Sequence, residues 1–217
     1  MANVNKKLMM KEDSLIAKDF SPLFDNLEGL SENQLSQHDK LYKGYIAKYN
    51  EVNKKLQNTD LLAANQNYSE FRSLKVELTH NLNGVILHEM YFANLIAAGK
   101  DPCQELQDIL SKDFGSWDGY IKDLKATGMA SRAGWAVTAY NYRDGKFYNY
   151  IIDQHNMQIP AFARPVLVMD TWEHAFMIDF GTDKKSYINT FLDNTNWQVM
   201  YERITSTLQT EEILNKF

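Results

Sequence analysis

The chain reads Asp170-Thr171-Trp172-Glu173-His174-Ala175-Phe176 directly after an apolar run. This stretch places a carboxylate, Asp170, and an imidazole, His174, four residues apart, and both side chains can ligate a metal ion. The preceding Pro165-Val166-Leu167-Val168-Met169 is apolar and rich in β-branched residues, which predicts a short buried strand with Asp170 at its end. The following turn can bring His174 back toward the same point. Alternatively, Asp170 caps the next helix and His174 lies on its surface, so the other histidines must decide.

The composition limits the chemistry of such a site. A chain of 217 residues with 44% hydrophobic content can bury a sizeable core, as one compact unit or two closely packed halves. The formal net charge of -5 argues against nucleic acid as the main partner. Cys103 is the only cysteine, which excludes an intrachain disulfide, a thiolate zinc site and an iron–sulfur cluster. Histidines and carboxylates remain as metal ligands.

The sequence also argues against a membrane partner. Residues 1–18 mix lysine, glutamate and aspartate with a few apolar residues, unlike the uninterrupted apolar core of a signal peptide. No stretch reaches the roughly 18 uncharged apolar residues of a membrane span. We therefore expect a cytoplasmic protein.

The first half of the chain predicts two long helices. One covers residues 31–56 and opens with Ser31-Glu32-Asn33-Gln34, in which Ser31 caps the helix and Gln34 returns the bond as a capping box. The other covers residues 68–98 and ends at Gly99. Both carry apolar residues at spacings of three and four. Two long helices joined by a polar connection are typical of an antiparallel hairpin, so the sequence predicts a helical hairpin domain over residues 1–100.

The second half predicts a sheet with helices around it. Asp101-Pro102 breaks the helical pattern, which resumes briefly around residues 106–110. Alternating segments rich in aromatic and β-branched residues then predict three strands, at 135–142, 146–152 and 166–170, the first two joined by an Asp-Gly turn. Helices are expected at 172–179, at 184–192 and near the C-terminus. The fold class is therefore α+β, with residues 101–217 forming a mixed domain around a three-stranded antiparallel sheet.

The histidines strengthen the metal hypothesis. The chain has five of them: His38, His80, His88, His155 and His174. A lone histidine on an apolar helix face is usually a hydrogen-bonded core residue, but His38 and His88 lie on adjacent antiparallel helices. With Asp170 and His174 they make three imidazoles and one carboxylate, a set that suits iron, manganese or zinc. His80 is predicted to be a surface or helix-face residue.

These residues resemble the iron and manganese superoxide dismutases. The family signature D-x-W-E-H-A-[YF] is matched at every defined position by residues 170–176. Residues 30–38 look like the approach to the first ligand, and residues 83–95 look like the second-ligand helix. The chain also has F-G-S at 114–116 and G-W-A at 134–136, where the family has the same motifs. The resemblance runs from about residue 18 onward.

The resemblance implies a fold, an activity and a ligand set. It makes His38, His88, Asp170 and His174 the four protein ligands of one iron or manganese ion per subunit, with a solvent molecule as the fifth ligand. Enzymes of this family convert superoxide to dioxygen and hydrogen peroxide by cycling the ion between the +3 and +2 states. The two metals share the same ligands, and iron is the one we favour.

The resemblance also implies catalytic residues beside the metal. Tyr45 matches the gateway tyrosine, which relays protons and narrows the channel; its alternative role is that of a half-buried core aromatic. His155 falls where many members have a glutamine that holds the metal-bound solvent and where some branches have histidine. The other family position for this contact is Gly84, which has no side chain, so we predict that His155 makes it. Trp135 and Trp172 match aromatic walls of the metal pocket.

The first-ligand motif departs from the family pattern. Relatives have H-H-x-K-H-H-x-x-Y, with the tyrosine eight residues after the ligand, whereas Tyr45 follows His38 by seven. Seven residues span nearly two helical turns, so Tyr45 stays on the face of His38. The missing residue predicts that a one-residue helix bulge of the relatives is straightened here. An alternative register makes Gln37 the counterpart of the ligand, but an amide is a poor ligand, so we assign His38.

A second departure concerns the subunit contact. The family's histidine on the first helix is replaced by Leu41 or Tyr42, and the tyrosine that it meets across the dimer interface is replaced by Phe176. An apolar pair avoids leaving one buried polar group without a partner. The family's other interface bond, from Glu173 to the partner's His174, can still form. We therefore expect a homodimer.

Two alternative functions remain. A mononuclear non-haem iron oxygenase, or a metal-dependent hydrolase, commonly uses two histidines and one carboxylate on a β scaffold. The helical placement of His38 and His88 disfavours this class. A non-catalytic relative used for binding or assembly is expected to lose ligands, yet all four are present.

Overall fold

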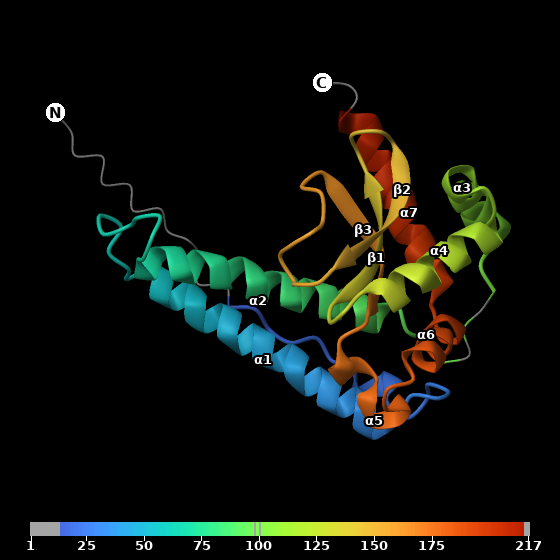
Figure 1. The fold of residues 1–217 in the computed structure, drawn as a ribbon, viewed down its shortest axis with the longest axis horizontal. Coiled ribbons are helices and arrows are strands. Elements are labelled where there is room, and N and C mark those ends of the chain that lie inside the picture. The colour runs from blue at the N-terminus through green and yellow to red at the C-terminus, as the bar shows by residue number, and fades with distance from the viewer. Residues whose placement is uncertain (1–13, 98, 100, 215–217) are drawn as a thin grey trace.

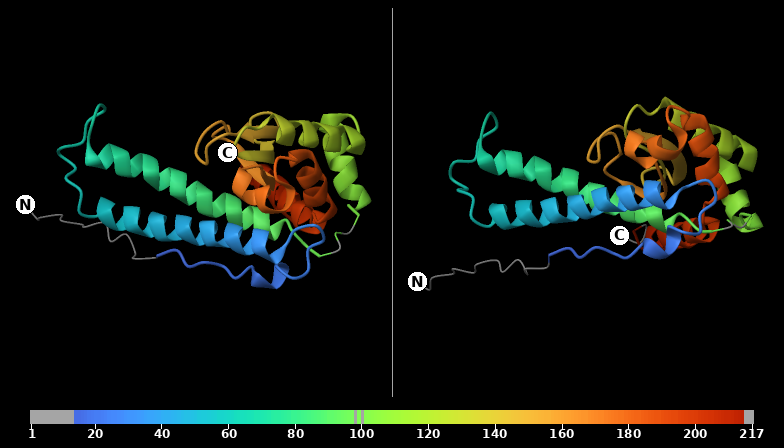
Figure 2. Two further views of the ribbon diagram at one scale, coloured as in Figure 1. Left: turned by 60° about the horizontal axis from the view of Figure 1, so that its bottom comes forward. Right: turned by 90° about the horizontal axis from the view of Figure 1, so that it is seen from below.

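The computed structural model describes residues 14–97, 99 and 101–214. The predicted α+β fold is confirmed. Its first half is an antiparallel hairpin of α1 (Glu32–Leu56) and α2 (Glu70–Ala93), which lie side by side and project from the rest of the molecule (Figures 1 and 2). A short 3-10 helix, η1 (Ser21–Leu23), precedes the hairpin.

The start of α1 follows only part of the predicted capping box. The Ser31 Oγ accepts a hydrogen bond from the Gln34 backbone N–H at 3.1 Å, as expected of an N-cap. The Gln34 side chain does not return a bond to Ser31, so this part of the prediction is wrong. The Ser31 N–H instead donates to the Asp179 carboxylate at 2.7 Å, because a charged carboxylate is a stronger acceptor than an amide. The Gln34 amide is thereby released for the contacts described below.

The second helix is shorter than its sequence pattern predicts. It begins at Glu70, after the N-cap Ser69, and ends at Ala93 rather than at residue 98. Beyond it, Leu95 forms an isolated antiparallel bridge with Thr195, and the Ile96 N–H donates to the Asn194 carbonyl at 2.9 Å. Pairing with this distant segment takes the backbone out of the helix.

The three predicted strands form one antiparallel sheet. They are β1 (Trp135–Asn141), β2 (Lys146–Ile152) and β3 (Ala163–Asp170), in the order β2-β1-β3. Trp135 lies opposite Ile152 on one side and opposite Asp170 on the other. The first residue of β1 therefore lies beside the last residues of β2 and β3, at the same end of the sheet.

The helices around the sheet differ in part from the prediction. They are α3 (Gln104–Phe114), α4 (Trp117–Ala130), α6 (Lys184–Asp193) and α7 (Trp197–Leu214), of which the sequence did not predict α4. The single helix expected at 172–179 is wrong, because the segment contains a 3-10 turn, η2 (Glu173–Ala175), and one helical turn, α5 (Met177–Phe180). Helix α4 contacts β1 and β2, whereas α2 and α7 contact β3. Within the described residues no helix combines the length and apolarity needed to cross a membrane.

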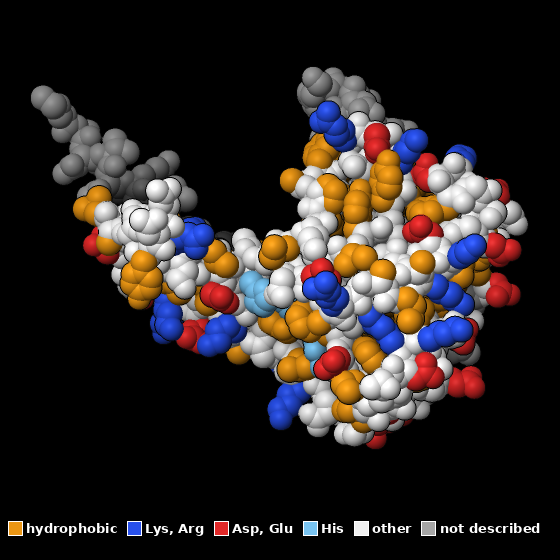
Figure 3. All heavy atoms as spheres, in the orientation of Figure 1, with side chains coloured by type: hydrophobic (Ala, Val, Ile, Leu, Met, Phe, Trp, Pro, Cys, Tyr) orange, Lys and Arg blue, Asp and Glu red, His pale blue; other side chains and the backbone are white. Residues whose placement is uncertain are grey.

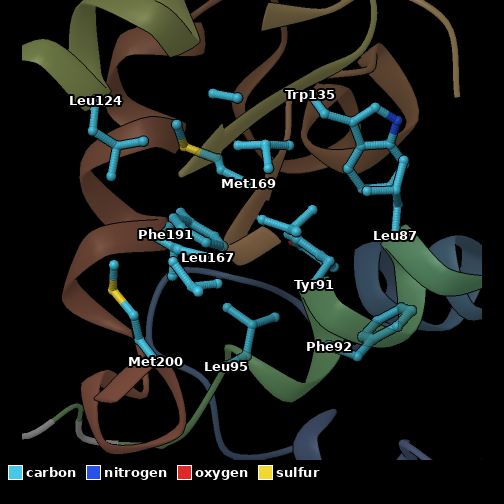
Figure 4. Close-up of a cluster of buried hydrophobic side chains, with 14 of the residues drawn as sticks. Leu87, Tyr91, Phe92, Leu95, Leu124, Trp135, Leu167, Met169, Phe191 and Met200 are labelled. Carbon is cyan, nitrogen blue, oxygen red and sulfur yellow. The ribbon is translucent and has the colours of Figure 1, made fainter. Parts of the chain in front are cut away.

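One hydrophobic core joins the hairpin to the sheet. Figure 4 shows side chains of α2 packed against residues of β1, β3, α4, α6 and α7. The labelled members are Leu87, Tyr91, Phe92, Leu95, Leu124, Trp135, Leu167, Met169, Phe191 and Met200. Because this core crosses residue 100, the division into domains 1–100 and 101–217 stays a prediction.

Candidate metal centre

Four side chains from four segments meet where the hairpin contacts the sheet. His38 comes from α1, His88 from α2, Asp170 from the end of β3 and His174 from η2. Each offers one ligand atom, and these atoms all lie within 4.8 Å of one another. The first three residues are fully buried, and the His174 side chain is 23% exposed. The structure thus brings together the four residues that the sequence predicts as metal ligands.

The Asp170 carboxylate is at the centre of this group. Its Oδ2 lies 2.9 Å from the Nε2 atom of His38, 3.3 Å from that of His174 and 3.9 Å from that of His88. Its Oδ1 accepts the Trp172 backbone N–H at 2.8 Å. Burial by itself raises the pKa of Asp170, but the neighbouring imidazoles of His174 and His38 hold this pKa well below its usual range. Asp170 is therefore an anion inside the protein.

The His88 imidazole presents an unprotonated nitrogen atom to this group. The Nδ1 of His88 lies 2.6 Å from the Gly84 carbonyl oxygen, which can only accept, so Nδ1 carries the proton. The Nε2 of His88 is then an unprotonated, buried atom without a hydrogen-bond partner in residues 14–97, 99 and 101–214. Burial, followed by the proximity of His38, lowers the pKa of His88 to about 3, and burial also lowers the pKa of His38. Neutral imidazole is the form that binds a metal ion.

This donor set fits one first-row metal ion. Nitrogen and oxygen ligands about 2.1 Å from one ion lie roughly 3 to 4 Å from each other. The three separations from the Asp170 Oδ2, 2.9, 3.3 and 3.9 Å, agree with this spacing. An ion also accounts for the buried Nε2 of His88, since a buried polar atom without a partner is costly. The residues present therefore fit iron or manganese.

His155 lies beside this group with a fixed tautomer. Its ring is buried just after β2, and its Nδ1 accepts the Trp135 indole N–H at 3.0 Å. Because indole nitrogen can only donate, the proton of neutral His155 must be on Nε2. This Nε2 is buried and has no partner among the described residues. Burial, followed by the proximity of His80, lowers the pKa of His155 to about 4, which favours the neutral form.

The Tyr45 ring packs against the His155 ring. The two rings are perpendicular, with centroids 4.8 Å apart, and the Tyr45 ring lies 5.2 Å from that of His88. Burial, followed by the Asp170 charge, raises the pKa of the Tyr45 phenol. A Cβ atom at Gly84 would lie 2.9 Å from the Tyr45 ring and 3.3 Å from the His155 ring. Glycine at this position therefore makes room for both side chains.

An open groove of about 820 Å³ leads from the surface to Tyr45 and His174. Its lining includes Lys40 and Lys48 but no acidic side chain. Exposed Gln37 also lines it, whereas neighbouring His38 is fully buried and reaches Asp170. The alternative register with Gln37 as the ligand counterpart therefore lacks geometric support.

Two supports of the site escaped the sequence prediction. The buried Gln34 amide donates to the His174 carbonyl at 2.5 Å and accepts the Ile178 N–H at 3.1 Å. The buried Tyr187 hydroxyl donates to the Asp170 carbonyl at 2.6 Å. The sequence pattern places Gln34 in a capping box and Tyr187 within a helix, and neither local pattern carries a signal of these distant contacts.

Comparisons with known proteins show to which family the chain belongs. Residues 102–203 match the family described as iron/manganese superoxide dismutases, C-terminal domain. The iron superoxide dismutase of Aquifex pyrophilus is 42% identical, covering 88% of this chain and 92% of the relative. A manganese superoxide dismutase of Halobacterium salinarum is 30% identical over 83% of this chain and 90% of its own length. An iron superoxide dismutase of Methanothermobacter marburgensis is also 30% identical, over 83% and 91%.

The chain belongs to the iron/manganese superoxide dismutase family. Its predicted departures from the family pattern have definite places in the fold. Helix α1 is α-helical throughout, which agrees with a straightened bulge before Tyr45. Leu41 is 42% exposed in the groove, whereas Tyr42 is fully buried and donates to Glu89. Phe176 is buried and stacks on Tyr187, with ring centroids 5.1 Å apart.

The contacts of Gln34 generate a first prediction. Gln34→Leu keeps a side chain of similar size but removes both hydrogen bonds that hold the segment from His174 to Ile178. We expect the unfolding free energy to fall by about 1–3 kcal/mol, because the His174 carbonyl and the Ile178 N–H lose their partner in part-buried contacts. Metal affinity should fall about 10- to 100-fold, the usual effect of losing a group that orients a ligand. Urea titration of the metal-free chain and competition with a chelator measure the two effects. Asn33→Ala, at the exposed neighbouring position, serves as the control.

Proposed function

We propose that this protein is a superoxide dismutase that uses one iron or manganese ion held by His38, His88, Asp170 and His174. The observation that carries the proposal is the convergence of three imidazoles and one carboxylate, whose ligand atoms all lie within 4.8 Å of one another. Membership of the family supports the assignment. Iron remains the metal that we favour, and relatives named for each metal are similar to this chain.

The bound ion supplies the redox chemistry: one superoxide gives up an electron and leaves as dioxygen, and a second takes an electron and two protons and leaves as hydrogen peroxide. The protein must then admit a small anion and supply protons. We assign His155 as the donor to the oxygen atom of solvent or substrate in the site, since its buried Nε2–H has no hydrogen-bond partner in the described part of the chain. We assign Tyr45 as the gateway, since it lies between the groove and His155.

The two alternatives have less support. A non-haem iron oxygenase commonly presents two histidines and one carboxylate, whereas a third imidazole converges here. A non-catalytic relative has no need for a tautomer that leaves the His88 Nε2 free. A cytoplasmic location stays a prediction from the sequence.

The central experiment tests ligands and activity together. The chain is produced in iron- or manganese-supplemented medium, followed by metal analysis and a superoxide dismutation assay. We expect about one ion per chain. His38→Ala should lower the affinity for the metal ion by more than the roughly 10- to 100-fold loss expected when a residue that only orients a ligand is removed. Gln37→Ala changes the exposed neighbouring residue and should retain metal and activity. A metal-loaded wild-type protein that does not dismutate superoxide would contradict the proposal. Loss of metal in Gln37→Ala but not in His38→Ala would make Gln37 the ligand instead of His38.

The groove generates a prediction about substrate capture. Superoxide is an anion and the protein carries a formal net charge of -5, so Lys40 and Lys48 provide local attraction against overall repulsion. Lys40→Glu should lower kcat/KM about two- to tenfold at low ionic strength, and salt should diminish the difference. Lys54→Glu changes the net charge equally on the same helix but outside the groove, and should have a smaller effect. Equal losses in the two variants would mean that the groove has no special role.

We also propose a homodimer through Glu173 and His174. Within the described part of the chain, exposed Glu173 forms no ion pair or side-chain hydrogen bond, and the partly exposed His174 uses only its Nε2. In a twofold dimer each Glu173 can accept the Nδ1–H of His174 of the partner subunit, which gives two equivalent bonds. Exposed Leu41 and Ile178 line the groove beside them and offer apolar surface to a second copy.

The dimer predicts a change of mass in solution. Glu173→Gln should weaken dimerisation roughly 100-fold, because two hydrogen bonds to a charged group are lost. Sedimentation velocity over a concentration series measures this. Glu105→Gln, an exposed glutamate of α3, is the charge-matched control. A wild-type chain that sediments as a monomer at all concentrations would contradict the dimer.

A further inference from the structure

His80 is the one histidine without a role in the proposed function, yet it lies against the site. It is half-buried on α2, eight residues before His88. Its ring centroid is 4.6 Å from that of His155 and 6.2 Å from that of Tyr45. Figure 3 shows histidine atoms at the surface where the helical hairpin meets the rest of the molecule. The half-buried His80 ring therefore packs against the buried His155 ring.

The His155 ring is enclosed by rings from three other segments. Trp135 donates to its Nδ1, Tyr45 stands perpendicular to it, and His80 lies across it at 45°. Gly84, one helical turn after His80, leaves the space that the His155 and Tyr45 rings occupy. Within the described residues the buried Nε2 of His155 has no hydrogen-bond partner, so its N–H needs an acceptor inside the site.

Such a ring needs more than one hydrogen bond to hold it. The Trp135 bond fixes the Nδ1 atom but leaves the plane of the imidazole free to tilt, and packed neighbours must limit the tilt. His155 belongs to an irregular segment between β2 and β3, whereas His80 belongs to a regular helix. Asn156 donates to the Thr79 hydroxyl at 3.0 Å, so the segment is tied to α2 independently of the His80 ring. Removing that ring therefore frees the imidazole without detaching the segment.

We propose that His80 is a positioning residue for His155: its aromatic ring, packed on the His155 imidazole, holds the Nε2–H aimed at the oxygen or anion bound in the site. The inference rests on the proposed function, which makes His155 the donor. It assigns the effect to the ring of His80 and not to its nitrogen atoms or charge, because no hydrogen bond joins His80 to His155 or Tyr45 within the described residues.

A pair of variants separates the ring from its polarity. His80→Phe keeps an aromatic ring without nitrogen atoms, and His80→Gln keeps hydrogen-bonding capacity without a ring. Glutamine is a good helix former, so α2 should stay intact. Val76→Ala, at an exposed position one turn earlier, controls for general effects on the helix.

The first readout needs no metal. The indole N–H signal of Trp135 in the two-dimensional NMR spectrum of the metal-free full chain, assigned with Trp135→Phe, reports whether the bond to His155 is intact. We expect protection of this N–H from solvent exchange in the wild type, His80→Phe and Val76→Ala, and faster exchange in His80→Gln.

The second readout is anion binding to the metal-loaded protein. Azide is the probe, and its affinity is followed by optical absorption at fixed pH. We expect His80→Gln to weaken azide binding and to lower kcat, each by about two- to tenfold, which is the fold-change that the loss of one aromatic pair produces. In His80→Phe both values should stay within about twofold of the wild type.

The outcomes are distinct. Wild-type values in His80→Gln, or equal losses in His80→Phe and His80→Gln, overturn the proposal. Metal-loaded wild type without dismutation refutes the proposed function instead, and the Trp135 signal then still decides whether the His80 ring holds His155.

Discussion

The buried charge of Asp170 is the constraint on which the rest of the structure depends. A carboxylate that is fully removed from water loses its hydration, which costs several kcal/mol unless the protein compensates for it. Here compensation comes from the imidazoles of His38 and His174 and from the Trp172 backbone N–H. His38 and Asp170 are 132 residues apart in the chain. The anion is therefore stable only when the hairpin and the sheet have docked on each other, and its pKa depends on the whole fold.

The docking is achieved by apolar packing around this polar centre. Side chains of α2 enter the same core as those of the sheet and of α6 and α7, so the helix that carries His88 is fixed against the strand that carries Asp170. The pairing of Trp135 with both Ile152 and Asp170 places the first residue of β1 between the end of β2 and the end of β3. The indole that fixes His155 and the carboxylate that faces the imidazoles are thus cross-strand neighbours. Rigid packing lets a few polar groups act in defined geometry.

Where sequence reasoning failed, a distant contact replaced a local one. The helix expected at 172–179 is interrupted because the His174 carbonyl accepts from Gln34 instead of from the next turn. The apolar pattern predicts too late an end for α2, because it continues into Leu95, which pairs with Thr195. Helix α4 is a different case. Ser116 followed by Asp118 is a local N-terminal signal, and the Ser116 hydroxyl accepts the Gly119 N–H as the N-cap, so the start of this helix is encoded locally.

The sequence by itself determined the donor types, the strand that ends in Asp170, the two long helices that carry His38 and His88, and the family. These follow from residue identity and local periodicity, which act over a few residues. Only the tertiary structure decided that His38 and not Gln37 reaches Asp170, that Gln34 supports His174, and that Leu41 faces the groove while Tyr42 is buried. It also decided the proton positions on His88 and His155, which depend on the Gly84 carbonyl and the Trp135 indole. The physical reason is that a hydrogen-bonding state belongs to a pair of groups, and the pairs here are made by folding.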